Sequence, residues 1–290
     1  MALTIHTNYS SLVTQTNLNK TNNALATNQQ RLGTGLRINS AADDAAGLQI
    51  ATRLSAQSKG MAVALRNVND ASSLLQTSDG AFGEMTDIMQ RMKDLATQSA
   101  NGTNSDDDRK AMQAEYDQLG KELGNIMDNT AFAGEKLFSK TGTAGKFGSA
   151  VNFQIGATTA ETLTLDISAK TTALGTQLAA LSSNYTTSGT GTEISTSGGA
   201  NAQIDLLATA LAKVGEVRGE FGANINRLNH TSNNLANMKD NTEMARGRIM
   251  DADFASESAM MSKNSMLMQS GISMLKQTGQ MPSMVMSLLG

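Results

Sequence analysis

Apolar residues return at helical spacing along most of this chain. Within 44–100 they step by three and four, as at Met61, Leu65 and Val68. The longest ladder keeps this alternation over ten positions, which are Ile204, Leu207, Leu211, Val214, Arg218, Phe221, Ile225, Leu228, Ser232 and Leu235. It predicts one helix of at least 32 residues, about 48 Å long at about 1.5 Å per residue. Only long neighbouring helices could cover such a stripe, so we expect the two halves of the chain to pack alongside one another.

A further helix is predicted after the polar stretch "NGTNSDDD". Ser105 can cap its start, because a serine oxygen accepts hydrogen bonds from the free amide groups of a first turn. Asp106, Asp107 and Asp108 place negative charge at the positive end of this helix. The three-and-four spacing then continues to about residue 128.

The period changes between the helical segments. Apolar and polar residues alternate in 151–155 and again in 163–167, on either side of "GATTAE". This pattern predicts a β-hairpin at about 147–168. The Ser/Thr/Gly run that follows at 182–201 is too polar to form a core, so we expect an exposed loop or the stub of a lost domain there.

Both ends of the chain carry apolar stripes with spacings of about seven residues. The residues are Ile5, Leu12, Leu18, Leu25 and Leu32 at one end, and Phe254, Met261, Met268, Ile272 and Leu275 at the other. Such spacing suits two helices that lie along each other. Many Asn and Thr residues lower the helix propensity of 1–30, so we expect both ends to be poorly ordered in an isolated monomer and to fold on association. Leu288 and Leu289 would then pack against copies of the chain.

Charge and composition exclude several partners and chemistries. The 290 residues carry a net charge of −3, which predicts no attraction to nucleic acid or anionic lipid. Residues 254–290 hold only Glu257, Lys263 and Lys276 as charged groups, which favours burial against a partner. The absence of cysteine excludes disulfides, thiolate catalysis and Cys-based zinc sites. We find neither a secretory signal pattern nor a stretch approaching about 18 apolar residues.

No group of residues predicts catalysis, a cofactor site or a metal site. His6 and His230 have no second metal ligand nearby in the sequence. The stretch "TGTAGKFG" lacks the glycine spacing and the Ser/Thr of a phosphate-binding loop. An enzyme on a helical scaffold is therefore disfavoured.

Two groups of charged residues have structural explanations. The stretch "SAAD" at 40–43 matches a capping box that opens the next helix. A second set predicts ion pairs between helices or between subunits rather than catalysis. It consists of Asp43, Asp44, Arg246, Arg248, Asp251 and Asp253. Such pairs contribute little at a surface unless an interface buries them.

Three long motifs resemble the terminal regions of bacterial flagellin. They are "RLGTGLRINSAADDAAGLQIATRL" at 31–54, "ALRNVNDASSLLQTSDGAFGEM" at 64–85 and "RGRIMDADFASE" at 246–257. The resemblance covers about 1–175 and 202–290. It suggests a short, two-domain flagellin, with a lateral or swarming flagellin as one form of that type.

The resemblance implies a mainly α fold, in which both chain halves build a long antiparallel helical coiled-coil rod with a small β-hairpin region. Residues 1–43 with 251–290 would form an inner coiled-coil core that is disordered in the monomer. Residues 44–181 with 202–250 would form the rod domain. The run 182–201 would replace the outer domains of longer flagellins.

The implied function is structural, with no enzyme activity and no cofactor. The chain would polymerise with itself into the flagellar filament, outside the cell, after export through the flagellar type III channel without a cleaved signal peptide. Further implied partners are the cap and hook-filament junction proteins and an export chaperone at about 250–290. An alternative from the same export system is the hook-filament junction protein itself.

Two sets of residues are candidates for interaction sites. The candidates for the polymer core are Ile5, Leu12, Leu25, Leu32, Met268, Ile272, Leu275, Leu288 and Leu289. Arg91, Leu95 and Glu115 match the surface that the flagellin-sensing Toll-like receptor contacts in the family. Alternatively, Arg91 and Glu115 simply link neighbouring helices.

Overall fold

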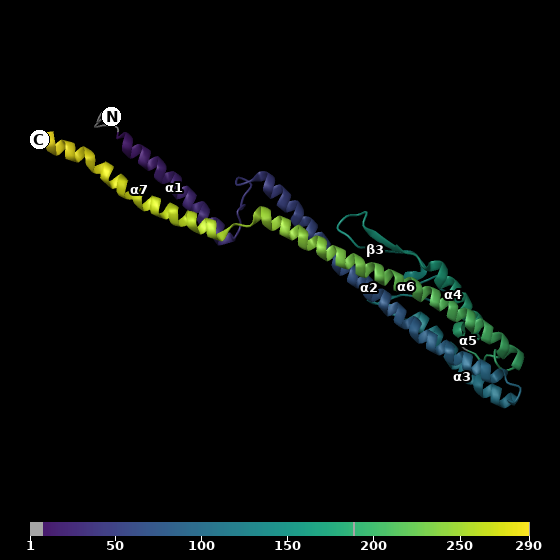
Figure 1. Ribbon diagram of the computed structural model, residues 1–290. Coiled ribbons are helices and arrows are strands. Elements are labelled where there is room, and N and C mark those ends of the chain that lie inside the picture. The colour runs from purple at the N-terminus through teal and green to yellow at the C-terminus, as the bar shows by residue number, and fades with distance from the viewer. Residues whose placement is uncertain (1–7, 188, 290) are drawn as a thin grey trace. The chain divides into compact units, whose positions relative to one another are not determined.

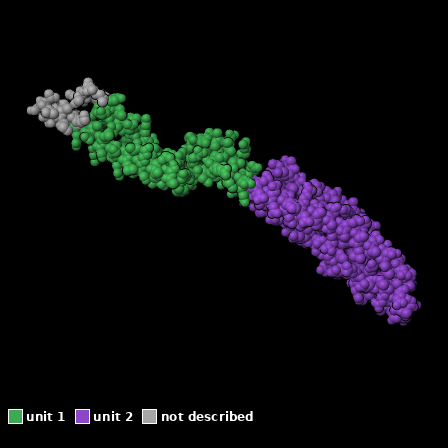
Figure 2. Space-filling view, viewed as in Figure 1, with its two compact units in different colours: residues 1–58, 240–290 green, residues 59–239 purple. Residues whose placement is uncertain are grey.

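The protein is described here from a computed structural model that covers residues 8–187 and 189–289, with no side-chain description for 281–290. It is mainly helical, as the sequence predicts, and contains two small antiparallel hairpins (Figure 1). The chain divides into two compact units, residues 1–58 with 240–290 and residues 59–239 (Figure 2). Each unit thus takes its residues from both halves of the sequence. The domain boundaries at 43 and 251 stay a prediction.

In the first unit, helix α1 (Tyr9–Thr34) lies antiparallel beside helix α7 (Phe254–Leu289) (Figure 1). Asn8 caps α1 by accepting a hydrogen bond from the Ser11 amide. Gly35 ends α1 with a φ of 72°, a left-handed conformation that glycine adopts without steric cost. Just beyond these helices, Leu36 forms an isolated antiparallel bridge with Asp251. The two chain ends are therefore paired at the backbone as well as through side chains.

The second unit is built on the long helices α2 (Ala45–Ala100) and α6 (Ser197–Met250), whose ends belong to the first unit. The predicted ladder on α6 is confirmed, since Leu207, Val214 and Phe221 are fully buried. Arg218, also on the ladder, donates to Asp79 of α2 at 2.8 Å. Helices α3 (Asp106–Asn129), α4 (Ser168–Leu181) and α5 (Ser183–Thr186) complete the unit.

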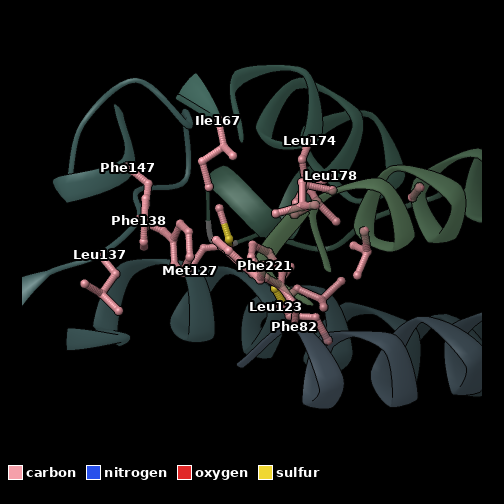
Figure 3. Packing of buried hydrophobic residues seen from close by; sticks show 14 of the residues in the cluster. Phe82, Leu123, Met127, Leu137, Phe138, Phe147, Ile167, Leu174, Leu178 and Phe221 are labelled. Carbon is pink, nitrogen blue, oxygen red and sulfur yellow. The ribbon is translucent and has the colours of Figure 1, made fainter. Parts of the chain in front are cut away.

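Four phenylalanines from distant parts of the sequence meet in this core (Figure 3). Phe82 of α2 and Phe221 of α6 have ring centroids 5.8 Å apart. Phe138 and Phe147 come from the connection after α3 and lie 4.9 Å from Phe82 and 5.5 Å from Phe221, respectively. Offset aromatic pairs at such distances stabilise a core beyond their buried area. The irregular connection is thereby fastened to both long helices.

The predicted cap at Ser105 is confirmed. Its side chain accepts from the Asp108 amide, and the Asp108 carboxylate accepts from the Ser105 amide. This reciprocal pair satisfies two groups that a helix start would otherwise leave unpaired.

The predicted hairpin is confirmed as strands β3 (Val151–Gln154) and β4 (Thr162–Leu165), which pair Phe153 with Leu163. Leu163 and Leu165 on one face of β4 are buried, as period-two alternation requires. A second hairpin was not expected from the sequence. It consists of β1 (Ala131–Phe132) and β2 (Glu135–Lys136). A short 3-10 helix, η1 (Lys146–Gly148), follows it along the chain.

The prediction of an exposed loop at 182–201 is wrong. Tyr185 and Ile194 have fully buried side chains, and α6 already begins at Ser197. Polar groups hold the segment on α3, since the Gln113 side-chain amide donates to the Glu193 carboxylate at 2.7 Å and the Ile194 amide donates to the Gln113 oxygen at 2.7 Å. The prediction of exposure rested on the polar composition of this run. Composition does not show that polar side chains can be buried when they form hydrogen bonds with backbone groups.

No helix in the described part of the chain is long and apolar enough to cross a membrane. Over the same residues there is no group of three acidic, His or Cys side chains placed to hold a metal ion.

Candidate functional site

The seam between α1 and α7 is only partly apolar. The covered or half-covered positions step by three and four, and they include Ser11, Thr14, Leu18, Thr21, Leu25 and Asn28 on α1 and Glu257, Met261, Asn264, Met268, Gly271, Leu275 and Thr278 on α7. Most of these positions hold a polar residue or glycine. Burial of this seam therefore contributes less than burial of an ordinary coiled-coil seam, in which apolar side chains fill both positions of the repeat.

Large apolar side chains lie instead on the outer surface of the pair. They are 39% to 69% exposed and comprise Tyr9, Leu12 and Val13 on α1 and Phe254, Met260, Met266, Leu267, Ile272 and Met274 on α7. We call these nine residues the outer apolar surface. Exposed large apolar side chains in such number on one helix pair are typical of an interaction site on a soluble protein.

The predicted polymer-core residues fall into three groups. Leu25 is buried, and Leu32, Met268 and Leu275 are half-buried within the unit. Leu12 and Ile272 are exposed and belong to the outer apolar surface. Ile5 lies outside the described residues, as do the side chains of Leu288 and Leu289. Their common role in a polymer stays a prediction.

A polar cluster interrupts the seam where α1 ends and α7 begins. Asn28 Nδ2 donates to one carboxylate oxygen of Glu257 at 2.5 Å, and Arg31 Nη1 donates to the other at 3.0 Å. Asn264 Nδ2 donates to the Asn28 oxygen at 2.9 Å. Asn28 and Glu257 are both 5% exposed. We call Asn28, Arg31, Glu257 and Asn264 the seam cluster.

Sequence reasoning missed the seam cluster. The available signal was that Asn28 and Asn264 stand on the same three-and-four ladder as the neighbouring leucines and methionines. A polar residue at such a position in a two-helix seam often specifies alignment.

The expected ion pairs within the chain are wrong. None of the six residues named for them forms one among the described residues. Asp44 accepts from the Gly47 amide at 2.8 Å and caps α2, and Asp253 accepts from the Ala255 amide at 2.9 Å and caps α7. These carboxylates instead satisfy backbone groups that helix starts leave free. Pairing between subunits stays a prediction.

The capping box expected at "SAAD" is also wrong, because Ser40 lies four residues before Asp44, which caps α2. Asp43 accepts from the backbone amides of Asn39 and Ser40, and these hydrogen bonds lower its pKa. This arrangement closes a turn before α2, which begins only at Ala45.

The receptor candidates divide between surface and core. Arg91 Nη2 lies 2.7 Å from Glu115 Oε1, and both side chains are about half exposed. This pair links α2 to α3, as the alternative interpretation expected. Leu95 is only 2% exposed, because it follows Met92 by three residues on the buried face of α2. The prediction that Leu95 lies on the receptor surface is therefore wrong, since Leu95 is a core residue.

Comparison with known proteins identifies the family. Residues 5–143 match the bacterial flagellin N-terminal helical region, and residues 204–289 match the bacterial flagellin C-terminal helical region. The chain belongs to the flagellin family. As a flagellin it is a structural subunit that polymerises into the flagellar filament, and it is not an enzyme.

Full-length relatives agree with this assignment. The flagellin is 35% identical to Flagellin A of Vibrio anguillarum and 34% identical to Polar flagellin C of Vibrio parahaemolyticus, and each alignment covers 100% of both chains. Those alignments run over 384 and 389 positions, whereas this flagellin has 290 residues. The relatives are therefore longer.

Two solved structures are similar to this flagellin. A crystal structure of Bacillus cereus flagellin is 34% identical, with a TM-score of 0.48 over 59% of this chain and 88% of that one. A putative flagellar hook-associated protein from Vibrio parahaemolyticus is 16% identical, with a TM-score of 0.58 over 72% of this chain and 100% of that one. The second likeness shows a shared fold alone.

Proposed function

We propose that the terminal helix pair of this flagellin forms the inner contacts of the filament, with the outer apolar surface packed against neighbouring copies. The observation that carries the proposal is the distribution of side chains on α1 and α7. Polar residues occupy much of the seam, whereas nine large apolar side chains are exposed. Burying one such side chain stabilises an assembly by about 1.5–3 kcal/mol.

The charge of these helices favours association of like with like. In the described part of α7 the charged residues are Glu257, Lys263 and Lys276, and Glu257 is neutralised within the seam by Arg31. Identical surfaces that carry few charges repel each other little when a polymer brings them together. A second copy of the chain is therefore the occupant that fits the outer apolar surface.

The weak seam supports the expectation that the ends fold as they assemble. Two helices with a half-polar seam gain little from pairing with each other, and helices gain most of their stability from packing. Contacts between copies would supply the missing apolar burial. Ordering and polymerisation are then one coupled event.

Seeded filament growth tests this function. In Met266→Gln combined with Leu267→Gln, two exposed side chains of α7 become polar, and we expect elongation from filament seeds to fall at least about tenfold. Ser262→Gln combined with Ser270→Gln is the matched control, because both serines are exposed on the same helix. Normal elongation by the methionine and leucine variant would refute the proposal.

The full-length likeness to flagellins favours a filament subunit over a hook-filament junction protein. We further propose an extracellular place in the filament, reached through the type III channel, and contacts with the cap and junction proteins at the filament ends. The exposed apolar side chains of α7 also support the expected binding of an export chaperone at about 250–290, since a chaperone that covers them would delay polymerisation.

A secondary role as an agonist of the flagellin-sensing Toll-like receptor rests on Arg91 and Glu115. Their half-exposed ion pair presents both charges on one face of α2 and α3. We expect Arg91→Ala combined with Glu115→Ala to reduce receptor-reporter signalling at least about tenfold, because two polar contacts are lost together. Lys213→Ala, which removes an exposed ion pair with Glu216, should not. Equal signalling by both proteins would exclude this role.

A further inference from the structure

The apolar part of the α1–α7 seam does not define a single alignment of the two helices. Leu18, Leu25 and Leu32 follow one another at intervals of seven residues, and so do Met261, Met268 and Leu275. In an antiparallel pair, a slip of seven residues therefore gives these apolar side chains the same repeating arrangement across the seam again. Packing of these six residues distinguishes the native alignment only weakly from its slipped neighbours.

The observed alignment is nevertheless well defined by contacts along the pair. A Cβ atom on Gly271 would lie 3.2 Å from a Leu18 side-chain carbon, and Asn8 Nδ2 donates to the Thr278 carbonyl at 2.8 Å. Among the described residues of α1 and α7, Asn28 and Glu257 are buried polar side chains that are matched to each other across the seam. The side chain of Glu257 is 7% exposed and that of Arg31 is 28% exposed.

A slip of one heptad would separate Glu257 from both Asn28 and Arg31. In one direction the contacts of Glu257 would fall on Thr21 and Ala24, which supply no cation. In the other direction Glu257 would pass the end of α1 at Thr34, and Arg31 would lose its carboxylate partner. A carboxylate or amide buried against apolar side chains without a hydrogen bond is strongly disfavoured. The cluster therefore penalises both slipped alignments.

We propose that the seam cluster sets the register of α1 against α7 and thereby determines which outer apolar surface each copy presents for assembly. The four side chains are positioning residues, since they act through the placement of other side chains. This inference rests on the proposed role of the outer apolar surface, to which both helices contribute.

Register matters because the outer apolar surface is composite. Tyr9, Leu12 and Val13 come from α1, whereas Met266, Leu267 and Met274 come from α7. A slip of seven residues would displace one set from the other by about 10 Å. A helical polymer repeats one contact between identical surfaces, so a mixture of registers would stop growth.

Engineered disulfides can measure the register, because the natural chain contains no cysteine. Leu18→Cys with Gly271→Cys reports the native alignment. Ser11→Cys with Gly271→Cys reports a slip of seven residues in one direction, and Leu18→Cys with Thr278→Cys reports the opposite slip. Each protein is oxidised both as soluble subunits and in seeded filaments, and disulfides within one chain are separated by electrophoresis from those between chains.

The decisive variant is Glu257→Met in each reporter background. With Glu257 present we expect the native disulfide to dominate, whereas Glu257→Met should raise the yield of slipped disulfides about tenfold. The same variant should elongate filaments at least about tenfold more slowly. Glu220→Met is the control, because it removes an ion pair with Lys170 in the other unit.

A charge-swapped protein separates register from simple loss of stability. Arg31→Glu combined with Glu257→Arg restores an ion pair across the seam, so it should return the disulfides toward the native register. Equal disulfide patterns with and without Glu257 would overturn the proposal. So would mixed registers accompanied by normal elongation. Failure of the broader proposed function would appear instead as normal growth of the Met266→Gln, Leu267→Gln protein.

Discussion

At the scale of single residues, equivalent side chains have different roles in the two units. Phe221 is fully buried against the rings of Phe82 and Phe147, whereas Phe254 is 56% exposed at the start of α7. A buried aromatic ring stabilises the subunit that contains it. An exposed one stabilises only an assembly that covers it.

These two phenylalanines give a matched pair of substitutions. We expect Phe221→Ala to destabilise the subunit by about 3–5 kcal/mol, because it leaves a cavity among close-packed rings. Phe254→Ala should leave the melting of the subunit unchanged and slow filament elongation. Thermal melts followed by circular dichroism, together with seeded growth, measure both effects. A large loss of melting temperature in Phe254→Ala would contradict the assignment.

At the scale of elements, the segment that covers part of α3 is rich in polar residues. We call residues 182–187 and 189–196 the strap. Its contacts with α3 include a hydrogen bond from the Gly191 amide to Asp117 at 3.0 Å. Gln113 donates to the Glu193 carboxylate at 2.7 Å. The strap thus depends on hydrogen bonds to the Asp117 and Glu193 carboxylates to keep Tyr185 and Ile194 buried.

The strap should loosen in acid. Burial by itself raises the pKa of Glu193, but hydrogen bonds from the Ser183 amide and hydroxyl and from Gln113 outweigh it, and the pKa is lowered. A lowered folded pKa means that the stabilisation is complete above the unfolded value of about 4.3 and is lost as pH falls through the folded pKa.

Glu193→Gln tests the acid dependence of the strap. We expect it to cost about 1 kcal/mol at neutral pH and to reduce the loss of stability between about pH 5 and pH 3. Hydrogen exchange of the Ile194 amide, compared at both pH values, measures the opening of the strap. An identical acid response in the natural and variant proteins would show that Glu193 does not control it.

At the scale of the whole molecule, we propose that folding and assembly use different surfaces. The second unit has a continuous apolar core that includes Leu75, Met89, Leu123 and Leu207. The terminal helix pair has a half-polar seam and an outer apolar surface. The core of the second unit stabilises the subunit, and we propose that the outer apolar surface mediates association.

Assembly through apolar contacts predicts a particular response to salt. Between about 0.05 and 0.5 M sodium chloride we expect the elongation rate to change less than about twofold, because screening affects mainly exposed charges. Sulfate at equal ionic strength should accelerate growth, since it strengthens apolar burial. Seeded growth followed by light scattering measures both responses. If the elongation rate fell tenfold as sodium chloride was raised over this range, ion pairs between copies would dominate assembly instead.

The sequence by itself determined the helical character of the chain, the cap at Ser105, the hairpin at Phe153 and Leu163, and the family. Each of these depends on local periodicity, on neighbouring residues or on long motifs, all of which the linear order of residues contains. The apolar ladder of α6 was equally predictable, because Leu207 and Val214 must face the same side of one helix.

Only the tertiary structure decided which groups meet across the chain. Asn28 and Glu257 are 229 positions apart, and no local pattern indicates that the two form a hydrogen bond. Burial of Tyr185 depends on the carboxylates of Asp117 on α3 and Glu193 within the strap. Leu95 lies in the core because neighbouring helices cover it. Partner choice for polar groups depends on three-dimensional proximity, since a hydrogen bond requires its two atoms within about 3 Å.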